Sequence, residues 1–409
     1  MRPSEPVVPA EPDPPASRPL RNEGRNEPDD HPDRVLRVAI VPDSFKGSVS
    51  ALEAATAMAR GVREASVAAT LDLRTCPMAD GGEGTLDALL DAWGVTARTC
   101  ATTDALGRPV IARYGLSPDG TGVIEAAEAN GLPQVSDVPL QPLVADTRGV
   151  GRVALTLLDE GAREIILCVG GSATTDGGTG LLAALGARFL DPTGQPLPPG
   201  GRSLRALDRI DLTDLHPRAR GVTWRVACDV SNPLVGPDGA AVFGPQKGAT
   251  PADVVVLDAA LARVAEVVAA ETGLDLRDRP GMGAAGGIAL LLAAFCGAEL
   301  VEGSTLVAET LGLDAVLDGV DLVLTGEGRF DDQSLHGKVV DAVASRAPTG
   351  VPVVVVAGAV CVPVAAMRAH GITAAFATAR GPRTLDEVTR SALDDITYTT
   401  AMVTRLLGL

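Results

Sequence analysis

The sequence predicts an α/β protein with mostly parallel sheet. Short apolar runs typical of buried strands alternate with longer segments of helical periodicity, a pattern typical of parallel strands joined by crossover helices. Loops rich in glycine and aspartate follow several of the apolar runs. Hydrophobic residues make up 46% of the chain but aromatic residues only 2%, so the core must consist mainly of Ala, Val, Leu and Ile, which suits layered α/β folds.

The first strand and helix are marked clearly. Residues 37–41 form an apolar run, and the polar loop 43–47 follows it. Ser50, with Glu53 three residues later, forms a capping box and predicts the start of a helix. The chain therefore opens with a strand, a charged loop and a helix.

The same design recurs along the chain. Further strands are expected at residues 71–76, 123–125, 164–169, 224–228, 322–324 and 353–356. Further helices are expected at residues 86–93, 152–159, 181–189 and 251–272 and directly after 281–287, with Gly161 as a left-handed cap. Residues 1–34 hold nine prolines and few large apolar side chains, which predicts a disordered tail.

Charge and cysteine content exclude several classes of protein. The formal net charge of −17 disfavours binding to nucleic acid or to anionic membranes. The six cysteines have no CxxC spacing and lie mostly in apolar runs, so we expect reduced thiols and a cytoplasmic protein. No run is long and apolar enough for a transmembrane helix, and the N-terminus has no apolar signal core.

Two nucleotide-binding motifs are incomplete. Residues 281–287 match GxGxxG, but the preceding residues 275–280 are not an apolar strand, so a nicotinamide site is disfavoured. Gly337-Lys338 lacks both the upstream glycine and the following Ser or Thr of a Walker A sequence, which excludes a P-loop NTPase.

The polar loops are the candidate site. Carboxylates, glycines and lysines follow the expected strands, and parallel sheets place ligands at the carboxyl ends of their strands. Glycines let backbone amides approach an anion, and carboxylates can hold Mg²⁺ or accept a hydroxyl proton. The alternative for any single loop is ordinary turn chemistry, which also favours Asp-Gly and leaves a lysine facing water. Repetition at several strand ends favours a site.

These blocks together resemble bacterial glycerate kinases of the type I class. The resemblance covers residues 36–380 and rests on the following blocks, in this order: 42–47, 78–85, 170–178, 227–230, 232–234, 243–248 and 325–331. Residues 146–151 depart from the Tyr-Gly-Thr-Gly pattern that the family has at this place.

The resemblance implies a fold and an activity. It implies two α/β domains with the substrate cleft between them: a flavodoxin-like domain formed by residues 35–100 and 290–409, and an inserted domain formed by 101–289. The implied activity is the ATP-dependent phosphorylation of D-glycerate to 2-phosphoglycerate, with 3-phosphoglycerate as the alternative product. ATP and Mg²⁺ are the implied cofactors, ATP and glycerate the small-molecule partners. A non-catalytic sensor of a phosphorylated acid is the alternative, and the oligomeric state stays open.

Roles for the site residues follow as expectations. Asp176 is the first candidate for the base that accepts the glycerate hydroxyl proton, Asp229 is the second, and Lys46 is expected to hold phosphate oxygens. The residues expected to bind substrate or phosphate are Asp43, Ser44, Gly81, Gly82, Gly177, Gly178, Asn232, Lys247, Gly286, Arg329 and Lys338. The residues expected to bind metal are Asp80, Glu83, Glu327 and Asp331.

Overall fold

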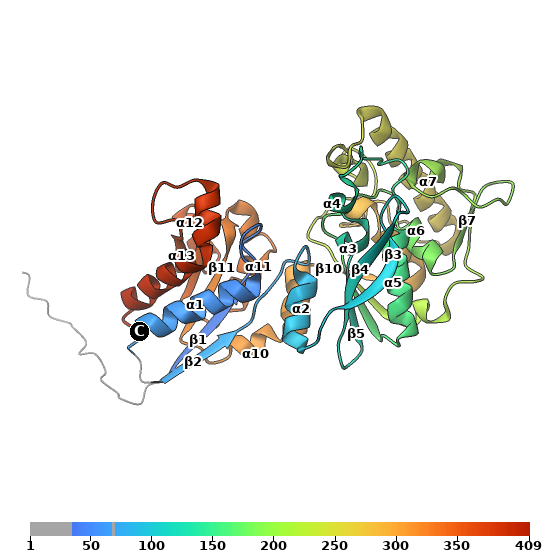
Figure 1. Cartoon of the computed structure of the whole chain (residues 1–409). Coiled ribbons are helices and arrows are strands. Elements are labelled where there is room, and N and C mark those ends of the chain that lie inside the picture. Colours follow the sequence, from blue (N-terminus) through green and yellow to red (C-terminus); the bar gives the residue numbers. More distant parts are fainter. Residues whose placement is uncertain (1–34, 68–69) are drawn as a thin grey trace, which may run out of the picture.

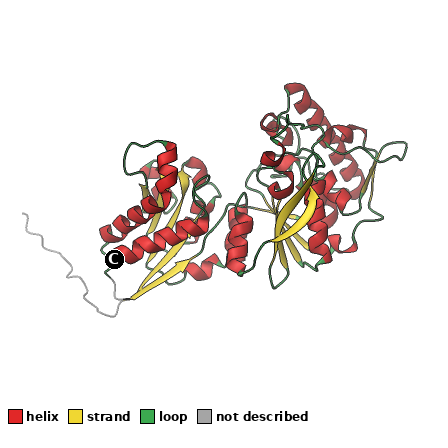
Figure 2. Ribbon diagram, in the orientation of Figure 1, coloured by secondary structure: helices red, strands yellow, loops and turns green. Residues whose placement is uncertain are grey.

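The computed structural model describes residues 35–67 and 70–409, so the expected tail lies outside the described residues. Most strands belong to two sheets, which form separate groups in Figures 1 and 2. The chain enters the first sheet, passes through the second and returns to the first. Within the described ranges, no helix has the length and apolarity needed to cross a bilayer.

The first sheet has five parallel strands in the order β13-β12-β11-β1-β2. Its strands are β1 (Val35–Pro42), β2 (Thr70–Thr75), β11 (Leu322–Phe330), β12 (Val353–Val360) and β13 (Ala374–Ala377). Counted along the chain, this order is 2-1-3-4-5, which is the flavodoxin-like order. The predicted α/β class and parallel sheet are confirmed.

Two long helices cover one face of this sheet. Helix α1 (Ala51–Ala65) begins with the predicted capping box, in which the Ser50 hydroxyl accepts a hydrogen bond from the amide of Glu53 at 3.2 Å. Helix α13 (Leu385–Leu406), which the sequence analysis did not anticipate, lies beside α1 (Figure 1). A Cβ at Gly61 of α1 would stand 2.4 Å from the carbonyl oxygen of Thr397, so glycine permits this close helix packing.

The second sheet has six strands in the order β10-β9-β6-β5-β4-β3. Its strands are β3 (Arg98–Thr103), β4 (Pro109–Leu116), β5 (Thr121–Glu125), β6 (Glu164–Cys168), β9 (Thr223–Ala227) and β10 (Glu299–Val301). Only β4 pairs antiparallel, with both neighbours, and the other pairs are parallel. The hairpin strands β7 (Arg188–Leu190) and β8 (Arg209–Asp211) form a small sheet of their own.

Helices fill the space beside and between the sheets. The α-helices not yet given are α2 (Thr85–Trp93), α3 (Ala127–Asn130), α4 (Leu132–Val135), α5 (Arg148–Asp159), α6 (Thr179–Ala184), α7 (Pro251–Thr272), α8 (Ala289–Cys296), α9 (Gly303–Leu311), α10 (Leu313–Leu317), α11 (Val339–Arg346) and α12 (Val364–Ala369). Short 3-10 helices lie at Gly201–Ala206, Pro217–Arg220, Ala240–Phe243, Pro245–Lys247, Ala284–Gly286 and Asp332–Leu335.

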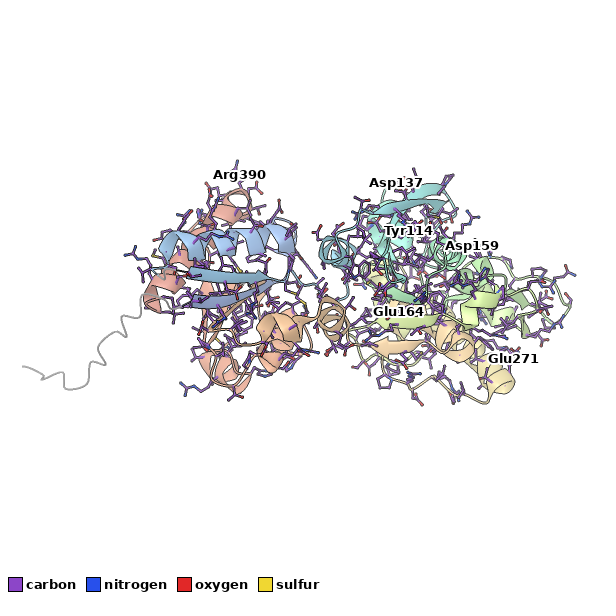
Figure 3. The ribbon with its side chains drawn as sticks, turned by 90° about the horizontal axis from the view of Figure 1, so that it is seen from below. Tyr114, Asp137, Asp159, Glu164, Glu271 and Arg390 are labelled. Atoms are coloured by element: carbon purple, nitrogen blue, oxygen red, sulfur yellow. The ribbon has the colours of Figure 1, made fainter. Side chains whose placement is uncertain are left out.

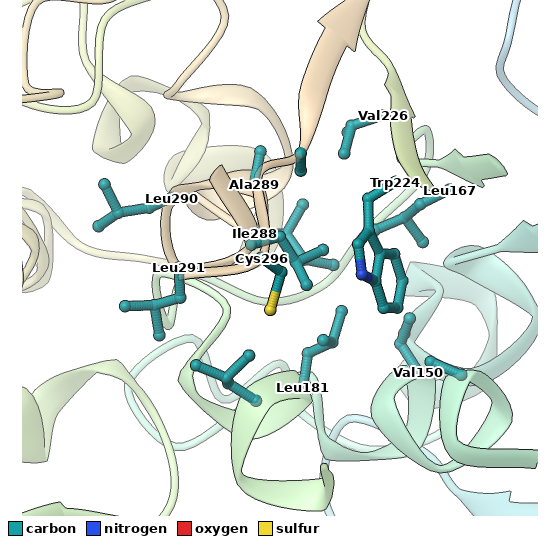
Figure 4. Packing of buried hydrophobic residues seen from close by; sticks show 14 of the residues in the cluster. Val150, Leu167, Leu181, Trp224, Val226, Ile288, Ala289, Leu290, Leu291 and Cys296 are labelled. Atoms are coloured by element: carbon teal, nitrogen blue, oxygen red, sulfur yellow. The ribbon is translucent and has the colours of Figure 1, made fainter. Parts of the chain in front are cut away.

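Strand alternation decides which core each side chain joins. In β5, Ile124 packs with α5 to α8 in the largest core cluster, whereas the neighbouring Val123 packs with α2. Trp224 lies in the larger cluster beside Val150 and Leu181 (Figure 4). The cluster around α2 and α9 contains buried residues of both sheets, so one apolar layer joins them. Figure 3 draws the side chains as sticks on the ribbon, with Arg390 of α13 and Glu271 of α7 on different parts of the molecule.

Three local expectations differ from the structure. Residues 325–330, expected as a loop, continue β11 because they pair with β12 out to Val360. Residues 188–189, expected at the end of a helix, belong to β7, since α6 already ends at Ala184. Residues 299–301 lie in the second sheet beside β9, although the expected domain boundary assigns them to the first domain. The division into domains remains a prediction.

Candidate active site

A cavity of about 1130 Å³ lies where strand ends of both sheets meet. Its walls come from the loops after β1 and β2 of the first sheet and from those after β5, β6 and β9 of the second. Ten of the site residues predicted from sequence line it: Asp43, Ser44, Lys46, Asp80, Gly81, Gly82, Glu83, Asp229, Lys247 and Lys338. The loops converge because parallel strands present their carboxyl ends on one edge of a sheet.

All lysines of the chain line this cavity. The 409 residues contain only three lysines, Lys46, Lys247 and Lys338, and every other basic side chain except histidine is arginine. A lysine ammonium is a compact charge that suits phosphate and carboxylate oxygens. In a chain with a formal charge of −17, these lysines supply the positive charge that an anionic ligand requires.

Asp43, Lys46 and Asp80 form a charged group at the end of β1 and β2. The Lys46 Nζ lies 3.4 Å from Oδ2 of Asp80. Burial and the nearby Asp80 carboxylate raise the pKa of Asp43 to about 6. Burial lowers the pKa of Lys46, but Asp80 and Asp43 raise it by more, so the ammonium stays charged.

Asp229 follows β9 and faces this group from the second sheet. One of its oxygens, Oδ1, accepts a hydrogen bond from the amide of Gly303 at 2.7 Å, which fixes the carboxylate at the start of α9. Burial, with smaller contributions from Asp80 and Glu302, raises the pKa of Asp229 to about 7. A carboxylate whose pKa lies near neutrality is suited to accept a proton at physiological pH.

Glycines bring the two walls together. Gly81 has a φ of +82°, and a Cβ there would stand 2.6 Å from Cα of Gly303. A Cβ at Gly170 of the second sheet would stand 3.1 Å from Cα of Gly82. A larger residue at Gly81 would therefore push the Asp80 loop away from α9. Glycine at this position allows the two backbones to approach closely beside the cavity.

Glu327 belongs to β11 and does not line the cavity. Its Oε1 is buried and has no hydrogen-bond partner in the structure. Burial, then the nearby Asp43 carboxylate, raises the pKa of Glu327 to about 7. Within the described parts of the chain, no three His, Cys, Asp or Glu side chains form a metal-ligand cluster by themselves.

Asp176 does not line the cavity. Its side chain is completely buried and accepts hydrogen bonds from the Thr147 amide (2.9 Å), the Thr147 hydroxyl (2.8 Å), the Gly178 amide (3.2 Å) and the Gly180 amide (3.0 Å). Burial raises the pKa of Asp176, and these hydrogen bonds oppose that shift. This carboxylate holds the start of α6 against Thr147, the residue before α5. It is not placed to act as a base on a substrate in the cavity.

Other predicted residues also serve local structure. The Gly177 amide donates to the Gly286 carbonyl at 2.9 Å, and Cβ atoms at Gly178 or Gly286 would clash with backbone oxygens at 2.4 and 2.2 Å, so these glycines pack two loops together and do not line the cavity. The Asn232 side chain donates to the Asp238 carbonyl at 2.8 Å and closes its own turn.

Arg329 and Asp331 also do not line the cavity. They pair with each other, with Nε and Oδ2 3.0 Å apart; Arg329 belongs to β11, and Asp331 directly follows this strand. Arg148, in the segment that departs from the family pattern, does not line the cavity and lies 3.7 Å from Asp146.

Sequence reasoning missed several cavity residues. Arg113 of β4 lines the cavity, where it pairs with Glu128 at 2.7 Å and with Asp87 at 2.9 Å. Ser172 and Glu125 also line it. Glu125 had a visible signal, since it ends an apolar strand, whereas Arg113 lies on an antiparallel strand that the sequence analysis did not anticipate.

Glu125 gives a test of the buried charge. Burial raises the pKa of this carboxyl from 4.5 to about 7, although its oxygen accepts a hydrogen bond from the Leu86 amide at 2.7 Å. Between these two pH values the folded state binds a proton that the unfolded state has lost, so stability falls as pH rises. Glu125→Gln is therefore expected to be more stable than wild type at pH 8 by about 1–3 kcal/mol and similar to it at pH 4.

Urea unfolding at both pH values measures this difference, with Glu64→Gln as the control because Glu64 is exposed. Equal gains at pH 4 and pH 8 would show that ionisation of Glu125 is not the cause.

Comparison with known proteins gives a consistent result. The glycerate kinase family model matches residues 38–408. The chain is 44% identical over 364 residues to "Glycerate 2-kinase" of Escherichia coli (strain K12), which spans 88% of this chain and 95% of that protein. It is also 44% identical over 362 residues to "Glycerate kinase" of Bacillus subtilis (strain 168), with 88% and 94% covered.

A solved structure agrees in fold. The crystal structure of a Salmonella typhimurium LT2 protein that carries the provisional name glycerate kinase 2 superimposes on this chain with a TM-score of 0.83, at 42% sequence identity. The match covers 91% of this chain and 98% of that one.

Proposed function

Because the chain belongs to the glycerate kinase family, we propose that it transfers the γ-phosphoryl group of ATP to D-glycerate and releases 2-phosphoglycerate. The 2-position is supported by the name of the Escherichia coli relative, which aligns over most of both chains. The observation that carries the proposal is the cavity itself: loops of two sheets bring all three lysines into one cavity with Asp43, Asp80 and Asp229.

Phosphoryl transfer requires positioning and charge stabilisation. Lys46 and Lys338, both at the first sheet, are the side chains proposed to hold phosphate oxygens. Asp229 is proposed as the base that accepts the proton of the glycerate 2-hydroxyl, in place of Asp176, because Asp229 lines the cavity and Asp176 does not. Its hydrogen bond from Gly303 would hold the accepting carboxylate in one orientation.

The residues present fit a magnesium ion. Asp43 and Asp80 repel each other in a buried place, and Glu327 keeps a buried oxygen without a partner, so a cation would relieve both. One or two carboxylates suffice, since Mg²⁺ retains waters and phosphate oxygens as ligands. Mg²⁺ bound here would offset the negative charge that develops on the transferred phosphoryl group. Asp80 and Asp43 are the proposed protein ligands, with Glu83 in the loop of Asp80 and Glu327 in β11, where the Asp43 carboxylate helps to raise its pKa.

A coupled assay tests the proposal. The purified chain, ATP, Mg²⁺ and D-glycerate should release ADP, and ³¹P and ¹³C NMR of the product should show phosphate on C2. Phosphate on C3 would correct the position and keep the kinase. If the chain binds D-glycerate or phosphoglycerate but shows no turnover, the proposal is overturned and the alternative of a non-catalytic sensor is favoured.

A further inference from the structure

Lys247 differs from the other two lysines of the cavity in being buried. It lies in the short 3-10 helix Pro245–Lys247. Lys247 as a whole residue is only 3% exposed, whereas the side chain of Lys46 is 62% exposed. The ammonium donates to the Thr174 carbonyl at 2.6 Å and to the Ser172 hydroxyl at 3.1 Å. Two of its three N–H donors are therefore used, and the third remains for a ligand.

The charge of Lys247 has no carboxylate partner among the residues that the structure describes. The Asp176 carboxylate acts on this ammonium through its charge, but it accepts its hydrogen bonds from Thr147, Gly178 and Gly180 instead. Burial accordingly lowers the pKa of Lys247 to about 8, and Asp176 only partly opposes this shift. A buried ammonium without a counter-charge is destabilising, so its presence in a cavity wall calls for a ligand that brings the negative charge.

Ser172 adds a second donor at the same place. Its hydroxyl accepts from Lys247, and in the described residues the hydroxyl hydrogen has no acceptor, so it is free to donate to a ligand oxygen. Ser172 is 5% exposed and is fixed by pairing of its backbone with Gly131. An ammonium and a hydroxyl side by side match the two oxygens of a carboxylate.

The position separates this pair from the phosphate end of the cavity. Lys46 follows β1 and Lys338 precedes α11, both beside the first sheet, whereas Ser172 follows β6 of the second sheet. Lys247 contacts the second-sheet side through Ser172 and Thr174. The two groups of cations thus come from opposite walls, which suits a ligand pair with one anion at each end.

We propose that Lys247 and Ser172 form the subsite that binds the carboxylate of the small hydroxy acid, and thereby make the acid group a requirement for a substrate. The inference rests on the proposed function. It adds that the carboxylate of the substrate binds on the second-sheet side of the cavity. Glycerol and other neutral polyols lack the group that the buried ammonium requires, so the cavity selects against them.

Lys247→Met tests the subsite. The KM for D-glycerate is expected to rise at least about 30-fold, because one partner of a buried, hydrogen-bonded charge pair is removed, while the KM for ATP stays near that of wild type. Lys338→Met is the matched comparison: the same change at the opposite wall is expected to raise the KM for ATP more than that for D-glycerate. Ser172→Ala is expected to act in the same direction as Lys247→Met, but more weakly.

Thermal unfolding separates a binding role from a structural one. Without ligand, Lys247→Met should be at least as stable as wild type, because an uncompensated buried charge has been removed. D-glycerate should raise the Tm of wild type and leave that of Lys247→Met unchanged. A variant that is less stable and is still stabilised by D-glycerate would show that Lys247 only holds the 172–174 loop, and would overturn the inference.

The kinetic outcomes are equally distinct. An unchanged KM for D-glycerate, or a rise confined to ATP, would overturn the subsite while leaving the kinase intact. A wild-type chain that does not phosphorylate D-glycerate would instead remove the proposed function on which the subsite rests.

Discussion

Asp229→Asn is expected to lower kcat with D-glycerate by about 10²–10⁴-fold, the range that removal of a general base produces. The asparagine oxygen can still accept the hydrogen bond from Gly303, so the start of α9 should keep its place and the KM values should change little. The loss would then arise from the missing proton acceptor and not from a displaced loop. Steady-state kinetics with saturating ATP and D-glycerate measure it.

The control is Asp314→Asn, because the Asp314 side chain is 87% exposed and does not line the cavity. That variant should keep the kcat of wild type. If Asp229→Asn also retains near-normal turnover, Asp229 is not the base, and Asp43 becomes the next carboxylate to test because it lines the same cavity and also has a raised pKa.

Asp176→Asn is expected to reduce stability and to spare the chemistry. The carboxylate accepts four hydrogen bonds inside the protein, and an asparagine would direct its NH₂ group at one of these donors. An unsatisfied or opposed buried donor reduces the free energy of unfolding by about 1–3 kcal/mol. Urea unfolding measures this loss, and the kcat of the folded enzyme should remain near that of wild type.

The pair of variants distinguishes two interpretations of similar-looking sequence. Asp176 and Asp229 both follow apolar strands, and sequence reasoning ranked Asp176 first. A stable Asp176→Asn protein with strongly reduced kcat would restore that ranking. It would require the carboxylate to leave its four partners during turnover.

Much of the fold could be read from local patterns. The capping box at Ser50 and the helix at residues 251–272 appear where the sequence placed them, because both signals act within a few residues. The hairpin of β3 and β4 was missed, since its strands have mixed polarity and gain their stability from cross-strand pairing. Helix α13 was also missed. It lies near the C-terminus and packs along α1, which comes from the start of the described chain.

The candidate site divides in the same way. Sequence reasoning found Lys46, Asp80 and Asp229 because a charged loop after a buried strand is a local signal. It could not separate them from Asp176 or Arg329, which occur in loops of the same composition. Which side chain enters the cavity depends on where each strand stops and on which donors surround it, as the extended β11 shows for Arg329.

By itself, the sequence determined the α/β class, the polar loops after the strands and the family resemblance, since these depend on residue types and spacing along one chain. Only the tertiary structure decided which loops meet: it placed all three lysines in one cavity, closed Asp176 into a hydrogen-bonded core and left the Lys247 ammonium buried with no carboxylate partner among residues 35–67 and 70–409. The physical reason is that burial and charge pairing are set by neighbours distant in sequence, and these decide whether a polar group stabilises the fold or binds a ligand.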